Sequence, residues 1–299
     1  AFADPEHARS QCGRFLDRLA AHGTTSALVL GTVHAAATDA LFDEAARRRV
    51  RLAAGKVLMN RHGPRALRDR TDGIDETAAL IERWHGRDRL AYAVTPRFAI
   101  ACSEDQLRGA GKLLERYPGV YLHTHLAEHP EELAATARTF PDAADYVGVY
   151  ERFGLVGPQS VFAHGIHLSD SELGRLGAAG ATIAFCPSSN LFLGSGLLDL
   201  ARVDRAGVNL GVATDVGAGT SFSMLSTLAD GYRVAQLTST SWHPLTALYT
   251  ATLGNARALG WDGRVGRLAP GHEADVVVLS PHPDSVRISC KFSWLQQKH

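Results

Sequence analysis

Residues 90–125 read LAYAVTPRFAIACSEDQLRGAGKLLERYPGVYLHTH, and this stretch decides the fold class. The apolar segments 90–95 and 119–125 are short and contain β-branched and aromatic residues, which predicts two buried strands. Residues 103–117, which lie between them, have the periodicity of an amphipathic helix. A strand, a helix and a second strand in this order predict one unit of a parallel α/β fold.

The same alternation continues along most of the chain. Strands are predicted at 24–31, 51–59, 90–95, 119–125, 160–164, 181–185 and 209–215. Helices are predicted at 4–23, 38–49, 75–86, 103–117, 130–138, 142–153, 169–180, 197–206, 223–237 and 244–260, with a Ser/Gly-rich loop after residue 185. A closed (β/α)8 barrel needs eight strands, so we expect an α/β barrel of this TIM-like type whose first strand is missing from this chain. A doubly wound open sheet is the alternative, but no G-x-G-x-x-G motif follows the first predicted strand.

The last segment of the chain has a different character. Residues 275–280, DVVVLS, predict a strand, and Val286, Ile288, Cys290, Phe292 and Trp294 alternate with polar residues as in a half-buried strand. An unpaired tail is the alternative for the second of these segments. We therefore expect a catalytic barrel domain over residues 1–265 and a small C-terminal β segment over residues 266–299.

Composition restricts the classes of partner and the compartment. The chain has 299 residues, with 31 Lys and Arg against 31 Asp and Glu, so a nucleic-acid partner is disfavoured. The four cysteines are scattered without a C-x-x-C spacing, which fits a reducing compartment. There is no apolar run of about 18 residues and no signal-peptide pattern. These features predict a cytoplasmic protein that does not bind membranes.

Polar side chains collect where the predicted strands end, which in an α/β barrel is the catalytic rim. They are His34, Lys56, Asn60, Arg97, His125, Glu128, His164, Cys186 and Asp215. Simpler roles exist for some of them: a structural hydrogen bond for His34, a surface ion pair for Arg97, and a turn for Asp215. His125, His164 and Asp215 together are harder to explain in that way. Two imidazoles and a carboxylate at one rim suit a divalent metal such as zinc or iron.

The segment 119–132, GVYLHTHLAEHPEE, contains both residues that we assign to the predicted site and polar residues that we place outside it. His123 and His125 face the same side of a strand but lie about 6–7 Å apart along it, so only the later residue reaches the rim. We predict that His125 is a metal ligand and that His123 lies in the core. Glu128 follows in the loop, where its carboxylate can transfer protons as a general acid or base. His129 is predicted to be a solvated residue at a helix start.

Motifs in this order resemble those of the amidohydrolase superfamily, and more closely those of the guanine deaminases. They are GTVH, GKVLMNR, VTPRFA, THLAEHPEE, FAHGIHLSD, CPSSNLFLGSG and ATDVGAGTSFSML. The resemblance covers most of the chain, from about residue 25 to about residue 275. The resemblance implies one metal ion per site, usually Zn²⁺ with Fe²⁺ as the alternative, bound in part by His125 and Asp215. It also implies that a His-x-His pair on a first strand completes the metal site, and this chain lacks that pair.

The resemblance assigns roles to the remaining site residues as well. His164 corresponds to the histidine that binds the substrate or the attacking water, and Glu128 to the glutamate that transfers protons and contacts the substrate. Arg97 and Phe98 correspond to the pair that contacts the purine, through its polar edge and its ring face respectively.

The implied reaction is hydrolysis of guanine to xanthine and ammonia by a homodimer. Two alternatives stay open: an amidohydrolase acting on a related purine, pterin or triazine, and a non-catalytic incomplete barrel. Cytidine-type zinc deaminases use a different motif, P-C-x-x-C, which is absent from this sequence.

Overall fold

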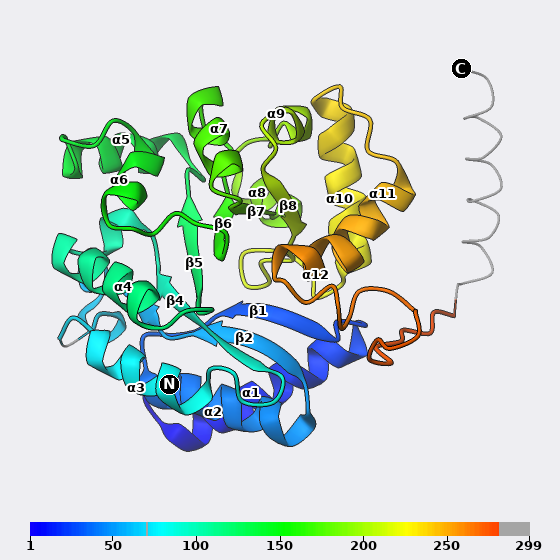
Figure 1. Ribbon diagram of the computed structural model, residues 1–299, viewed down its shortest axis with the longest axis horizontal. Helices are drawn as coiled ribbons and strands as arrows, with labels where there is room; N and C mark the ends of the chain where they lie inside the picture. The colour runs from blue at the N-terminus through cyan, green and yellow to red at the C-terminus, as the bar shows by residue number, and fades with distance from the viewer. Residues whose placement is uncertain (70, 281–299) are drawn as a thin grey trace.

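A computed structural model describes residues 1–69 and 71–280, and its centre is one parallel β-sheet (Figure 1). The strands are β1 Ser26–Leu30, β2 Arg51–Gly55, β3 Val57–Leu58, β4 Leu90–Pro96, β5 Tyr121–Leu126, β6 Ser160–His164, β7 Thr182–Phe185 and β8 Asn209–Val212. They are hydrogen-bonded in the order β1-β2-β4-β5-β6-β7-β8, and β3, just after β2, also pairs with β4. The order follows the sequence without a reversal, which a doubly wound sheet would require. The barrel-type prediction is confirmed.

Helices connect successive strands and cover the sheet, because parallel neighbours need crossover connections. The α-helices are α1 Pro5–Ala21, α2 Ala35–Arg48, α3 Ile74–Trp84, α4 Glu104–Arg116, α5 Pro130–Thr139, α6 Tyr146–Arg152, α7 Asp170–Ala178, α8 Pro187–Leu193, α9 Leu200–Arg205, α10 Met224–Leu237, α11 Pro244–Tyr249 and α12 Asn255–Ala258. Short 3₁₀ turns lie at Arg65–Leu67 and Ala99–Ala101, and a π-helical turn at Thr250–Gly254 joins α11 to α12.

The unit that decided the fold class forms as its sequence predicts. Ser103 caps α4 by accepting a hydrogen bond from the backbone N–H of Gln106 at 3.2 Å. Leu107, Ala110 and Leu113 on the inner face of α4 are buried. Gly55 lies where strands approach closely, because a Cβ there would overlap the carbonyl oxygen of Ala93 on β4.

Burial follows the position of each strand in the sheet. β2, β6 and β7 are buried along their whole length, as strands covered on both faces should be. β1 is only half-buried, and β8 begins with an exposed residue. Among the described residues these two strands pair on one side only, which accounts for their greater exposure.

Two sequence predictions are wrong. The segment after β7 was expected to be a loop, but Pro187–Leu193 forms α8, whose first turn accommodates the proline. The predicted strand over residues 275–280 is not formed: these residues have no strand partner within the described chain, and Val278 is 89% exposed. The predicted strand over residues 286–294 lies outside the described residues, and the division at residue 265 stays a prediction.

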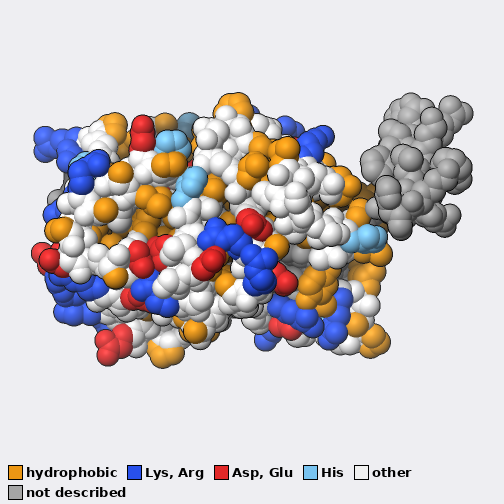
Figure 2. Space-filling model, turned by 90° about the horizontal axis from the view of Figure 1, so that it is seen from above, with side chains coloured by type: hydrophobic (Ala, Val, Ile, Leu, Met, Phe, Trp, Pro, Cys, Tyr) orange, Lys and Arg blue, Asp and Glu red, His pale blue; other side chains and the backbone are white. Residues whose placement is uncertain are grey.

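One face of the molecule is shown in space-filling form in Figure 2. On the face shown in Figure 2, acidic and basic side chains are interspersed, without a broad patch of one sign. Within residues 1–69 and 71–280, none of the helices combines the length and the apolar character needed to cross a bilayer.

Candidate active site

The predicted site residues meet at the C-terminal ends of four neighbouring strands. His125 lies on β5, with Glu128 in the loop after it, and His164 is the last residue of β6. Cys186 follows β7 directly, and Asp215 follows β8. The parallel order places these ends at one rim of the sheet, and the residues therefore converge although they are far apart in the sequence.

Three of these side chains are close enough to share one cation. The ligand atoms of His164, Cys186 and Asp215 all lie within 4.8 Å of one another. The His125 ring stacks on the His164 ring, with 5.3 Å between the centroids and an angle of 28° between the planes. Imidazole, thiol and carboxylate side chains are donor types that zinc binds, and the His125 ring adjoins the three that lie together.

His125 has the orientation expected of a metal ligand. Its Nδ1 lies 2.7 Å from the carbonyl oxygen of Arg97, which can only accept a hydrogen bond. The proton therefore resides on Nδ1, and the lone pair of Nε2 is free. Metal-binding histidines are commonly held in this way, with one ring nitrogen donating to a carbonyl group.

His164 is buried with one ring nitrogen occupied. The Asn190 amide donates to its Nδ1 at 2.9 Å, so in the neutral ring the proton lies on Nε2. Nε2 is 3.5 Å from Oε2 of Glu128 and has no hydrogen-bond partner within the described chain. Burial, and to a smaller extent the nearby His125, lowers the pKa of His164 to about 3. The imidazole is therefore neutral in this structure and presents an N–H group toward Glu128.

Glu128 is a partly buried carboxyl group with a raised pKa. Burial is the largest cause, and the charges of Asp215 and Glu132 add to it, whereas His125 opposes the shift. The Ser195 hydroxyl donates to Oε1 at 3.3 Å. The backbone N–H of Glu128 donates to Oε2 of Glu132 at 3.0 Å. A carboxyl group with this environment can both accept and return a proton.

The backbone is strained at the same rim. Ala127, His164 and Asp215 have φ values of 51°, 75° and 47°, a region that favours glycine. Such conformations cost about 1–3 kcal/mol each and concentrate at functional sites. Here they lie at the end of β6 and just after the ends of β5 and β8.

Arg97 and Phe98 lie beside the same cluster, directly after β4. The Phe98 ring meets the His125 ring edge-on, with 6.4 Å between centroids. The Arg97 guanidinium lies 5.2 Å from the centre of the Phe98 ring. Arg97 is exposed and Phe98 is half-buried, so a cation and an aromatic face border the rim.

Other residues singled out from the sequence do not join the cluster. His34 precedes α2 as its N-cap residue, without a capping hydrogen bond from its side chain. His123 lies one pleat below His125, where burial lowers its pKa to about 3. His129 is exposed and caps α5, as predicted. Lys56 is buried in an ion pair, and Asn60 hydrogen-bonds to Ser103.

Sequence reasoning assigned no role to three residues that the structure brings to the site. Two of them, Asn190 and Ser195, come from the segment after β7 and are buried. Asn190 hydrogen-bonds to His164, and Ser195 hydrogen-bonds to Glu128. Cys186 was noted at a strand end but was not proposed as a neighbour of Asp215. The sequence did contain a signal for a helix start here: in CPSSN, residues 186–190, a proline and small polar residues directly follow a predicted strand.

Comparisons with known proteins agree with this geometry. The sequence profile of the amidohydrolase family matches residues 3–297. The chain belongs to the amidohydrolase family. Amidohydrolases are typically metal-dependent, and the donor set at the rim of this family member fits a metal ion.

Among its relatives is a guanine deaminase of Escherichia coli (strain K12), 45% identical over 281 residues, which cover 94% of this amidohydrolase and 64% of that protein. A solved structure of E. coli guanine deaminase superposes with a TM-score of 0.90 at 45% identity, covering 91% and 64% of the two chains. A guanine deaminase of C. acetobutylicum with guanine bound in its active site has a TM-score of 0.84 at 27% identity, covering 89% and 65%. The chain thus spans somewhat less than two thirds of the length of these relatives.

Proposed function

We propose that this amidohydrolase acts in the hydrolytic deamination of guanine to xanthine and ammonia. The observation that carries the proposal is the position of Arg97 and Phe98 beside His125, because a donor and an aromatic face next to a metal-type cluster suit a planar purine. The 45% identity to a guanine deaminase of E. coli supports the same substrate.

His125 and Asp215 are the proposed metal ligands, and His164 and Cys186 flank them. A divalent ion such as zinc, when bound, lowers the pKa of water so that hydroxide is present near neutral pH. His125 is prepared for this role, because its Nδ1 hydrogen bond leaves Nε2 free. The Asp215 carboxylate lies within 4.8 Å of the ligand atoms of His164 and Cys186, and the His125 ring stacks on His164.

The other steps of the reaction, substrate binding and proton transfer, are assigned to separate side chains. Arg97 would donate hydrogen bonds to the polar edge of guanine, and Phe98 would stack against the ring. Water adds at C2 as its proton passes to Asp215, and Glu128 protonates a ring nitrogen. Glu128, now a carboxylate, takes the proton of the new hydroxyl group and passes it to the exocyclic amine, so that the C2–N bond breaks, ammonia leaves and C2 becomes a carbonyl carbon. The proton held by Asp215 then returns to Glu128. The Nε2–H group of His164 would donate to the oxygen at the tetrahedral carbon, an electrostatic role.

Ammonia release from guanine, measured with and without added zinc, tests this proposal. The Glu128→Gln variant should lower kcat, and Arg97→Ala should mainly raise KM, because Arg97 binds and does not react. Ammonia from a pterin or triazine but not from guanine would favour the alternative substrate class. Absence of both zinc uptake and ammonia release would support the non-catalytic alternative. The implied homodimer stays a prediction, which sedimentation analysis checks.

A further inference from the structure

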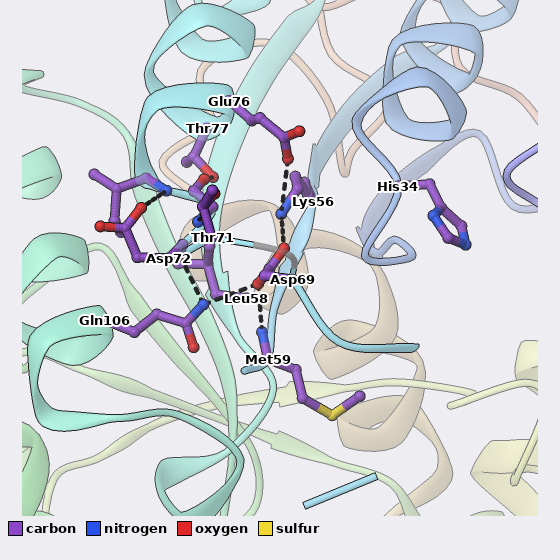
Figure 3. Close-up of polar contacts among 12 residues, drawn as sticks. His34, Lys56, Leu58, Met59, Asp69, Thr71, Asp72, Glu76, Thr77 and Gln106 are labelled. Atoms are coloured by element: carbon purple, nitrogen blue, oxygen red, sulfur yellow. Dashed lines mark hydrogen bonds and ion pairs between the residues drawn. The ribbon is translucent and has the colours of Figure 1, made fainter. Parts of the chain in front are cut away.

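A buried ion pair lies directly after the C-terminal end of β2, outside the cluster described above (Figure 3). Lys56 is fully buried between β2 and β3, and its ammonium group pairs with Asp69 and lies 3.3 Å from Glu76. The Asp69 side chain is only 2% exposed. Gly73 closes over the pair, because a Cβ there would come within 2.7 Å of Nζ of Lys56.

Asp69 also fixes both ends of the loop between Met59 and Asp69. Its Oδ2 accepts from the backbone N–H of Met59 at 2.9 Å and from the Gln106 amide at 2.8 Å. The backbone N–H of Asp69 donates to the carbonyl oxygen of Met59 at 2.7 Å. In Figure 3 the carboxylate lies between Lys56 on one side and Met59 and Gln106 on the other. One carboxylate therefore ties the loop to the end of β3.

The end of β3 in turn holds Arg97. The backbone N–H of Arg97 donates to the carbonyl oxygen of Leu58 at 3.0 Å. Its Nη1 contacts Sδ of Met59 at 3.6 Å, and Met59 packs with Phe98 in one buried cluster. The residues that fix Met59 thus also determine where Arg97 and Phe98 lie.

We infer that Lys56 and Asp69 are positioning residues that hold Arg97 and Phe98 in place for the purine. This inference rests on the proposed function, since it names what sets the specificity of that same site. A buried ion pair contributes little net stability compared with apolar residues of similar size. It does impose one geometry, because the carboxylate must satisfy an ammonium, a backbone N–H and an amide together.

Hydrogen exchange and kinetics on the full 299-residue chain test the inference. The variants are Asp69→Asn, which keeps the shape of the side chain, and Gln106→Leu, which leaves the ion pair and removes the amide that donates to Asp69 and to the carbonyl oxygen of Asp72. Glu44→Gln is the matched control, because Glu44 is a buried carboxylate whose ion pairs go to Arg47 and Arg48 of its own helix, α2.

For Asp69→Asn we expect faster exchange at the amides of Met59 and Arg97, and KM for guanine about tenfold higher with kcat nearly unchanged. Gln106→Leu should show the same pattern more weakly, and Glu44→Gln should show neither change. A folded Asp69→Asn variant with unaltered exchange, or with faster exchange and an unaltered KM, would overturn the inference. If the parent chain does not convert guanine, the proposed function fails. The exchange rate at Arg97 then decides the positioning role: acceleration supports it and no change overturns it.

Discussion

Tyr150→Phe removes a single hydroxyl group that supports the backbone of His125. Tyr150 lies on α6 and is fully buried; its hydroxyl donates to the carbonyl oxygen of His125 at 2.8 Å and lies 3.1 Å from Oγ1 of Thr124. The variant leaves both oxygen atoms without this partner. Losing a hydrogen bond at a buried acceptor costs about 1–3 kcal/mol, so we expect the free energy of unfolding to fall by about 2 kcal/mol.

The assay is urea unfolding followed by circular dichroism at 25 °C, with zinc titration of the folded variant. Tyr117→Phe is the control, because the Tyr117 hydroxyl bonds to Glu82 on the exposed surface, and we expect less than about 0.5 kcal/mol there. Because the His125 carbonyl loses its anchor, zinc affinity of Tyr150→Phe should fall by about tenfold, as for other residues that support a metal ligand. Equal unfolding free energies for Tyr150→Phe and the parent chain would refute the reasoning.

Three further predictions concern other parts of the molecule. The pKa of Glu273 is lowered, since its bonds to Arg89 and Arg51 outweigh the effect of burial. Its stabilisation is therefore present above the unfolded pKa of about 4.3 and is lost as pH falls through the folded pKa. The urea unfolding free energies of the parent and of Glu273→Gln should therefore differ at pH 6, and the difference should shrink as the pH falls below the unfolded pKa. Gly55→Ala should destabilise the chain by about 1–3 kcal/mol or more, seen as a lower urea midpoint, because the added methyl group meets a rigid backbone carbonyl; an unchanged midpoint would contradict the close approach. Asn190→Leu should lower kcat without altering the zinc content, because Asn190 is the hydrogen-bond partner of His164 Nδ1 and is not a proposed metal ligand. Loss of zinc from this variant would contradict the assignment of His125 and Asp215, without His164, as the ligands.

The fold and the rim were predictable because both depend on periodic patterns. Short apolar strands alternating with amphipathic helices determine a parallel sheet, and parallel strands bring their ends to one rim. His125, His164 and Asp215 could therefore be grouped from strand ends alone. Arg97 and Phe98 were assigned by resemblance, and the structure places Phe98 against His125.

Features that depend on side-chain partners were not predictable. Asn190 and Ser195 belong to a segment that was expected to be a loop, and only α8 and the turn after it bring them against His164 and Glu128. The Asp69 carboxylate joins Lys56, Met59 and Gln106, and nothing in local sequence indicates such a link. The strand predicted over residues 275–280 failed because an apolar run forms a strand only beside a partner.

An anomalous difference map from zinc-soaked crystals tests the central claim most directly. We predict one peak at the rim, about 2.0–2.2 Å from Nε2 of His125 and from a carboxylate oxygen of Asp215. Arg97 and Phe98 should border that peak. A zinc peak at another position, or no peak beside these two side chains in crystals soaked with excess zinc, would contradict the account.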